Sequence, residues 1–202
     1  MKKSVTAVLA AILTLACLCS CSVFTNTKAV KPSRGTVDGN VYHSDYSGIT
    51  LTVPENWYFY TDDEISQLVG ATVDIMKLDN AKAEAISKAA MDFFVADPET
   101  GDNISLTYEK VSPLVSQSTY IDAFTRNSES SYVSAGGSAS YKEDGTVTLS
   151  AKTYQRITGD LTLSGMDMKQ YVYVRKIGDY FLAVVFTVVS GTTAEQVEAM
   201  FS

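Results

Sequence analysis

The stretch KQYVYVRKIGDYFLAVVFTVV, residues 169–189, decides the fold. Its first part alternates tyrosine and valine with a period of two, which is typical of a β-strand with two different faces. Gly178 and Asp179 follow as the tightest hairpin signal of the chain. Residues 180–189 are almost entirely apolar, which predicts a central strand covered on both faces. An antiparallel sheet built around this hairpin is therefore expected.

Outward from this hairpin, the period of two predicts more strands, and helical patterns lie between groups of them. Strands are predicted over residues 49–53, 57–60, 91–95, 104–108, 146–149 and 152–163. Helices are predicted from Asp62 or Asp63, over residues 73–90, from Ser118 or Thr119, and after a capping box at residues 192–195. The Ser- and Gly-rich residues 128–140 predict a loop, and residues 143–145 a turn. The fold class expected is α+β, a mostly antiparallel β-sheet flanked by helices as an α/β/α sandwich.

The first twenty residues predict an export signal. Lys2 and Lys3 precede an apolar run over residues 7–18, which suits a secretory signal and falls short of the roughly 20 residues that a membrane-spanning helix needs. The run ends in Leu18-Cys19-Ser20-Cys21, which resembles the bacterial lipobox. We expect residues 1–20 to be a lipoprotein signal peptide and Cys21 to be lipidated. The alternative is ordinary cleavage near Ser20 or Ser22 without a lipid.

The remaining chain divides into a tether and one domain. Residues 21–40 are polar with little apolar periodicity, which predicts a flexible tether, and residues 41–202 predict a single α+β domain. All three cysteines lie at or before Cys21, so the domain is expected to have no disulfide and no thiolate metal site. The expected location is the cell membrane, where the lipid anchor holds the domain on the extracytoplasmic face.

The charge of the chain argues against a nucleic-acid partner. The full chain has a net charge of −7; without Lys2 and Lys3, fourteen basic and 23 acidic residues remain, a net charge of −9. Such a surface repels phosphate backbones. The sequence therefore predicts no nucleic-acid binding, and the charge suits a protein exposed outside the cytoplasm.

The order of elements resembles a known fold family. An opening strand, then Val53-Pro54-Glu55-Asn56-Trp57, the acidic helix start Asp62-Asp63-Glu64-Ile65, two strands, a helix, a meander and a closing helix are similar to the PsbP-like fold. The chain also resembles Firmicutes lipoproteins of this kind over about residues 42–201. The resemblance implies an antiparallel sheet between helices and a protein that holds a partner. It implies no catalytic residue.

Exposed tyrosines are the candidate binding surface. Alternation places Trp57 and Phe59 on one face and Tyr58 and Tyr60 on the other, and one of these pairs is expected to be exposed. Tyr171 and Tyr173 form a second stripe of the same kind. We predict that these four tyrosines, Tyr58, Tyr60, Tyr171 and Tyr173, include the binding residues.

Catalytic and metal sites find weaker support in the sequence. His43 is the single histidine, and it is interpreted as a surface residue at the start of the first strand. One histidine without a free cysteine predicts no zinc site, and no cofactor is expected. The acidic loop at residues 97–103 has oxygen ligands that suit calcium, but its spacing is not that of an EF-hand and a hairpin needs the same residues.

Three functions remain open at the level of sequence. The first is a non-enzymatic, membrane-anchored domain that binds a protein or a cell-envelope component. The second is a small-molecule or ion carrier that serves a transporter. The third is an envelope enzyme with a carboxylate-based site. A flat exposed patch would favour the binder, a deep apolar pocket the carrier, and a buried acid pair in a cleft the enzyme.

Overall fold

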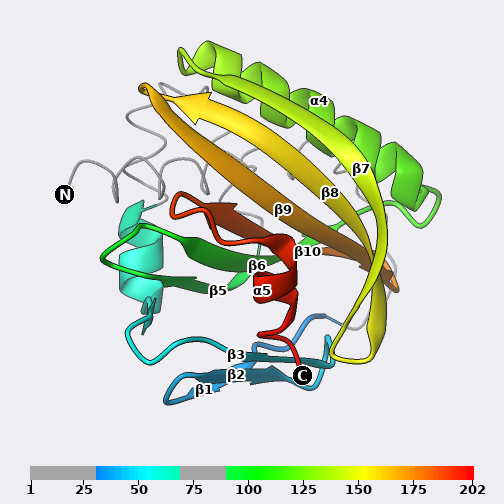
Figure 1. The fold of residues 1–202 in the computed structure, drawn as a ribbon. Coiled ribbons are helices and arrows are strands. Elements are labelled where there is room, and N and C mark those ends of the chain that lie inside the picture. Colours follow the sequence, from blue (N-terminus) through cyan, green and yellow to red (C-terminus); the bar gives the residue numbers. More distant parts are fainter. Residues whose placement is uncertain (1–30, 69–89) are drawn as a thin grey trace.

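The computed structural model describes residues 31–68 and 90–202, which form two antiparallel sheets with helices packed on the larger one (Figure 1). The small sheet has the order β1-β2-β3, with β1 at Thr36–Asp38, β2 at Val41–Ser44 and β3 at Ile49–Thr52. The large sheet has the order β4-β5-β6-β10-β9-β8-β7. The chain is thus an α+β protein, as predicted.

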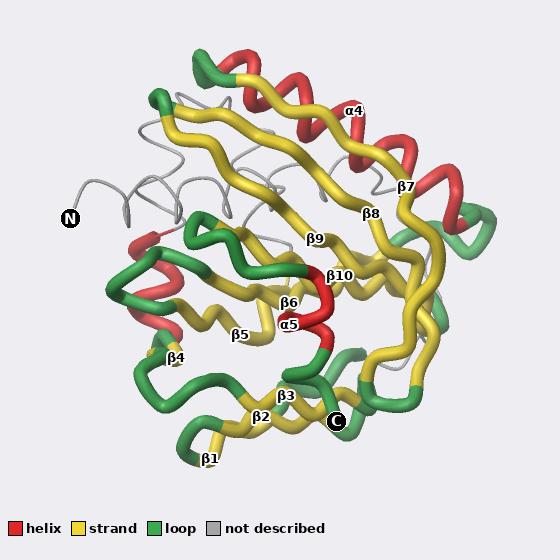
Figure 2. The backbone as a smooth tube through the Cα atoms, viewed as in Figure 1, coloured by secondary structure: helices red, strands yellow, loops and turns green. Residues whose placement is uncertain are grey.

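The seven strands of the large sheet are joined mainly by hairpins (Figure 2). They are β4 (Tyr58–Phe59), β5 (Ala90–Ala96), β6 (Asn103–Lys110), β7 (Ser138–Leu149), β8 (Lys152–Leu163), β9 (Met166–Ile177) and β10 (Tyr180–Val188). The hairpin at Gly178 and Asp179 pairs β9 with β10, and β6 pairs with the other side of β10. The apolar stretch is therefore the central strand, which confirms the prediction from its composition.

Alternate residues of β10 enter two different cores, one on each face of the sheet. Leu182, Val184 and Phe186 pack with residues of β2, β3 and the C-terminal segment. Phe181, Ala183 and Val185 pack on the opposite face against helix α4 (Gln117–Ser134). Helix α5 (Ala194–Glu198) lies on the first face and shares it with the small sheet. Helices thus lie on both faces, and a second sheet adds to the cover on one of them.

Several local predictions differ from the structure. Helix α4 extends to Ser134 and includes the serines that predict a loop, because Tyr132 and Ser128 are fully buried and packing outweighs helix propensity. Strand β7 continues through residues 143–145, where a bulge replaces the predicted turn. The first helix is capped by Thr61, in a capping box with Glu64, and not by the predicted Asp62 or Asp63. The capping box predicted at residues 192–195 forms one residue later, from Thr193 to Gln196.

The start of the folded domain also differs from the prediction. Residues 36–38 form β1, and the backbone N–H of Gly35 donates to Asp92 Oδ1 at 3.0 Å. The boundary predicted between residues 40 and 41 is therefore too late, and the domain includes at least residues 34–40. The helix predicted over residues 73–90 lies outside the described residues, apart from Ala90, which begins β5. Within residues 31–68 and 90–202, no helix is long and apolar enough to cross a membrane.

Candidate functional site

Part of the large sheet carries polar side chains that no described element covers. The registers place Ser140, Asp160 and Lys169 opposite one another on β7, β8 and β9, on the same face as Val188. In Figure 1, α5 and the small sheet lie over other parts of this face, and the far ends of β7–β9 extend beyond them. We define the open face as these residues: Ser138, Ser140, Lys142, Asp160, Thr162, Asp167 and Lys169.

Strand alternation explains why this face is polar. The residues between the open-face positions, Ala139, Leu161 and Met168, point through the sheet and pack around Tyr132 of α4. The apolar half of each strand is thus satisfied by the helix, while the polar half faces solvent. A groove of about 380 Å³ lies over the same strands and is lined by residues of β7, β8 and β9. The open face therefore rests on a packed support and presents short polar groups.

Hydrogen bonds and an ion pair fix the side chains of the open face. Lys169 Nζ lies 2.6 Å from Asp160 Oδ1, and this hydrogen bond raises the pKa of Lys169. The Thr162 hydroxyl donates to Asp167 Oδ1 at 2.8 Å. All four groups remain partly or fully exposed, so they can exchange these bonds for bonds to a ligand. Hydroxyl, carboxylate and ammonium groups lie together here, and they suit a polar ligand.

The row of polar residues on β8 continues from the open face to α5. Arg156 Nη1 lies 2.7 Å from Glu198 Oε1, and Arg156 Nη2 lies 3.1 Å from Asp144 Oδ2. Thr158 donates to the same carboxylate oxygen of Asp144 at 3.0 Å. The guanidinium thus joins the bulge of β7 to α5, and it closes the open face on the side of the C-terminal helix.

Comparisons with known proteins give a distant structural likeness only. No protein-family model matches the chain, and no curated protein matches it. A crystal structure of a protein from Bacteroides thetaiotaomicron VPI-5482 is similar, with a TM-score of 0.42 and 14% sequence identity. The match covers 81% of this chain and 47% of that protein. This chain therefore spans about half the length of the protein it matches.

The predicted tyrosine pair at the start of the domain lies partly at the surface. Tyr58 is 47% exposed, and its hydroxyl donates to Glu64 at 3.0 Å. Tyr60 packs edge-on against Phe94 and is partly buried. Trp57 stacks on Phe186 in the opposite core, as the alternation predicts. Tyr58 is thus available to solvent, but it lies on β4, at the opposite edge of the large sheet from β7.

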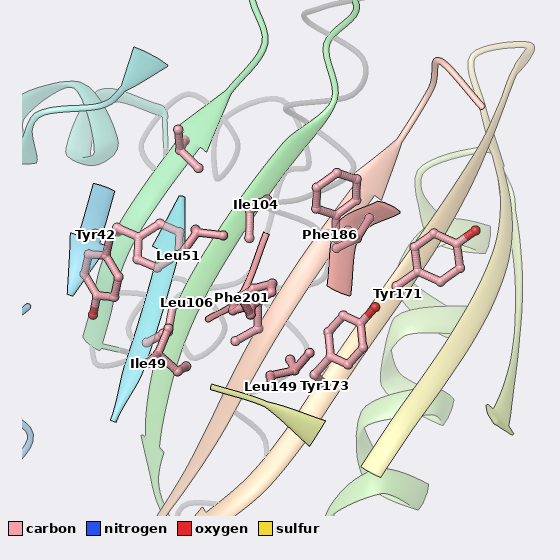
Figure 3. Close-up of a cluster of buried hydrophobic side chains, with 14 of the residues drawn as sticks. Tyr42, Ile49, Leu51, Ile104, Leu106, Leu149, Tyr171, Tyr173, Phe186 and Phe201 are labelled. Atoms are coloured by element: carbon pink, nitrogen blue, oxygen red, sulfur yellow. The ribbon is translucent and has the colours of Figure 1, made fainter. Parts of the chain in front are cut away.

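The prediction that Tyr171 and Tyr173 are exposed is wrong. Tyr173 is fully buried and Tyr171 is 8% exposed, and both belong to the core that contains Phe186 (Figure 3). The Tyr173 hydroxyl donates to Glu198 at 3.2 Å, and burial, followed by the charge of Glu198, raises its pKa. The small sheet and α5 cover these residues, and nothing in the alternation of β9 predicts this cover.

His43 lies on the small sheet, away from the open face. Its ring nitrogens lie 2.9 Å from Thr50 Oγ1 and 3.1 Å from Asp45 Oδ1. This order of hydroxyl, imidazole and carboxylate is that of a catalytic triad, but the Asp45 side chain is 98% exposed. An orienting acid in a triad is buried, so water competes for this one and the arrangement suits a surface contact.

The acidic loop between β5 and β6 uses its carboxylates to hold the backbone. Asp97 accepts from the N–H of Glu99 at 2.8 Å and from the Thr100 hydroxyl at 2.9 Å. Asp102 is 2% exposed and accepts from the N–H groups of Val189 and Ser190 at 2.7 and 2.9 Å. The loop therefore positions the connection from β10 to α5. Among the described residues, no three potential metal-ligating side chains of His, Cys, Asp or Glu gather at one point.

A second, smaller cavity lies where the chain enters the domain. It measures about 170 Å³ and is lined by Pro32, Ser33, Arg34, Met91, Asp92 and Tyr108. Asp92 is the extra residue of a bulge in β5, where the register shifts between Met91 and Phe93. Its carboxylate accepts from the Tyr42 hydroxyl at 2.5 Å as well as from Gly35. The acid thus fastens the entering chain to the sheet.

The open face was missed by reasoning from the sequence. Ser138 and Ser140 lie in a Ser-rich segment that predicts a loop, so their alternation with Ala139 and Tyr141 carries little weight. Asp160, Thr162, Asp167 and Lys169 alternate on two predicted strands and give the signal that was available. These side chains are exposed because α5 does not extend over them, and the position of α5 on the sheet is set by tertiary packing, which the sequence pattern does not show.

Proposed function

We propose that this chain is a non-enzymatic, lipid-anchored protein of the extracytoplasmic membrane face that binds a polar component of the cell envelope. The observation that carries the proposal is the open face, a supported and uncovered set of hydroxyl, carboxylate and ammonium groups on β7–β9. Lipidation of Cys21, predicted by the lipobox-like Leu18-Cys19-Ser20-Cys21, supports the location. More than one acyl chain is needed for stable anchoring, and a lipoprotein cysteine supplies them.

The chemistry of the open face supports a hydroxyl-rich ligand such as an envelope glycan. Ser138, Ser140 and Thr162 can each donate and accept a hydrogen bond, and Asp160 and Lys169 add charged partners of opposite sign. Hydrogen bonds that involve a charged group contribute about 1.5–3 kcal/mol each. Several such groups on one rigid surface can hold an extended polymer without an enclosed pocket.

We also propose that the chain belongs with the PsbP-like lipoproteins. The motif Val53-Pro54-Glu55-Asn56-Trp57 and the helix start at residues 62–65 support this assignment. Members of that group act mostly by holding a partner, which agrees with a binding role. The proposal assigns no catalytic residue and no cofactor.

Site-specific photo-cross-linking in intact cells tests the binding site. A photoreactive amino acid replaces Ser140 on the open face, and in a matched variant it replaces Ser130, an exposed serine of α4. We expect Ser140 to give a discrete adduct with envelope material and Ser130 to give none. Adding Asp160→Asn and Lys169→Gln to the Ser140 variant removes charged hydrogen-bonding groups and is expected to lower the adduct yield about tenfold.

Two results would contradict the proposal. Equal adducts from Ser140 and Ser130 would mean that the open face has no special role. A small molecule that copurifies with the chain, without an adduct at Ser140, would favour a carrier that serves a transporter.

A further inference from the structure

One turn of the domain presents an apolar side chain almost completely to solvent. Leu114, between β6 and α4, is 94% exposed. The turn is rigid, because the N–H of Val115 donates to Ser112 O at 3.0 Å and Lys176 Nζ donates to the carbonyls of Pro113 and Val115 at 3.0 and 2.7 Å. Fully burying a leucine side chain contributes about 1.5–3 kcal/mol, so this rigid turn holds an apolar group ready for contact.

The chain from the predicted lipid enters the domain at the same end of the molecule. Pro32 and Arg34 line a cavity together with Tyr108, near the end of β6. From Tyr108, only six residues lead to Leu114, which span at most about 20 Å. About 13 residues join Cys21 to Arg34, and they span at most about 45 Å. The domain is therefore held within reach of the bilayer by the end that carries Leu114.

The open face lies toward the opposite end. Asp167 and Lys169 of the open face lie near the start of β9, and Lys176, which holds the Leu114 turn, lies near its end. Asp167 and Lys176 are nine residue steps apart, which corresponds to about 30 Å in a strand. Figure 1 shows β9 and α4 running along the molecule between these two ends. A contact of Leu114 with the membrane would thus leave the open face directed away from it.

We propose that Leu114 is a second membrane contact, which inserts into the bilayer interface and holds the anchored domain upright. The proposal rests on an anchor at Cys21, because one leucine is too weak to bind a membrane alone, whereas a tether supplies a high effective concentration. We assign the lipid bilayer as the partner of Leu114 because the tether enters the domain at the end that carries Leu114. Val133 is 66% exposed and lies near the C-terminal end of α4, whereas Leu114 precedes the N-terminal end of that helix. Val133 is therefore the control.

Fluorescence quenching in vesicles tests this contact with an anchor supplied chemically. The chain from Cys21 onward, in which Cys21 is the sole cysteine, is coupled through its thiol to a maleimide lipid in phosphatidylcholine vesicles. Leu114→Trp and Val133→Trp are compared in vesicles with and without brominated acyl chains, with the wild type giving the background from Trp57. We expect the Leu114→Trp fluorescence to be quenched at least about twofold more than that of Val133→Trp.

Equal quenching of both variants, or none in either, would overturn the membrane contact. A blue shift of Leu114→Trp emission that depends on protein concentration without vesicles would also overturn it and assign the turn to a second copy of the chain. Because the lipid is attached chemically, neither result depends on natural lipidation or on binding at the open face. Failure of this contact and failure of the proposed function therefore give different observations.

Discussion

At the scale of single residues, Asp92 joins the entering chain to the large sheet. The bulge in β5 turns its carboxylate toward Tyr42 and the N–H of Gly35, and Arg34 Nε donates to the Asp92 carbonyl at 3.1 Å. Burial, followed by the hydrogen bond to Asp92, raises the pKa of Tyr42. A Cβ at Gly35 would lie 2.4 Å from the Tyr42 ring, so glycine is required for this approach.

Asp92→Ala is expected to destabilise the domain by at least about 2 kcal/mol, because two donors lose their acceptor and unsatisfied buried groups cost about 1–3 kcal/mol each. Urea unfolding followed by circular dichroism measures the change. Asp38→Ala is the control, since Asp38 is an exposed acid of β1 and a change within about 0.5 kcal/mol is expected. A similarly small change for Asp92→Ala would show that the carboxylate does not hold the entering chain.

The role of Asp92 could not be predicted from the sequence. Met91, Phe93 and Val95 alternate as a regular strand would, which predicts all three on one face. The bulge separates them, so Phe93 and Val95 enter the core with Tyr42 while Met91 packs on the other face. A bulge depends on the fit between strands, and single-sequence periodicity carries no sign of it.

Buried tyrosines make the domain less stable as the pH becomes alkaline. Burial raises the pKa of Tyr154 from 10.0 to about 12 and also raises that of Tyr173. The unfolded chain loses these protons near pH 10, whereas the folded chain keeps them. Stability is therefore fully present below pH 10 and falls as the pH rises from 10 to 12.

We expect the free energy of unfolding to fall with a shallower slope in Tyr154→Phe than in the wild type. The difference near pH 11 is expected to approach about 1.4 kcal/mol per pH unit, the limit for one proton. Urea midpoints measured at intervals between pH 9 and pH 11.5 give both slopes. Parallel slopes would mean that Tyr154 ionises at its ordinary pKa in the folded protein.

At the scale of elements, one tyrosine links three strands across a glycine. Tyr141 of β7, Gly159 of β8 and Gln170 of β9 are opposite one another, and the Tyr141 hydroxyl donates to Gln170 Oε1 at 2.6 Å. A Cβ at Gly159 would lie 2.4 Å from the Tyr141 ring. Strand β8 keeps its register at Gly159, and the glycine makes room for the ring.

Gly159→Ala is expected to cost about 1–3 kcal/mol through overpacking, and the cost should shrink in a Tyr141→Ala background. Equilibrium unfolding of the wild type, both single variants and the double variant completes the cycle. The same cost in both backgrounds would place the strain elsewhere than at the tyrosine ring.

Elements were predictable where burial follows a strict period. The central hairpin at Gly178 and Asp179, and the face of β6 that buries Ile104, Leu106 and Tyr108, were evident from alternation. The helical structure of residues 128–134 was not predictable, because their serines are poor helix formers and the buried Tyr132 holds them in α4. Burial of Tyr171 and Tyr173 was not predictable either, since a separate sheet and helix α5 supply their cover.

At the scale of the whole molecule, the domain has two different ends. The chain enters the domain beside Asp92 and Tyr108, at the end of the sheet that carries the Leu114 turn. The open face lies toward the opposite end, where β9 begins. The sequence predicts an anchor and a tether, but only the tertiary contacts of Arg34 and Gly35 with Asp92 place the tether at one end. An anchored domain with this arrangement would present its polar face to the envelope.

Mass spectrometry of the amino-terminal peptide of the protein from membranes tests the lipid anchor, on which the account depends. We predict that the mature chain begins at Cys21 and carries a diacylglyceryl group on its sulfur, whereas Cys21→Ala yields no lipidated peptide. A chain recovered from the culture medium with an unmodified amino terminus near Ser20 or Ser22 would contradict the account.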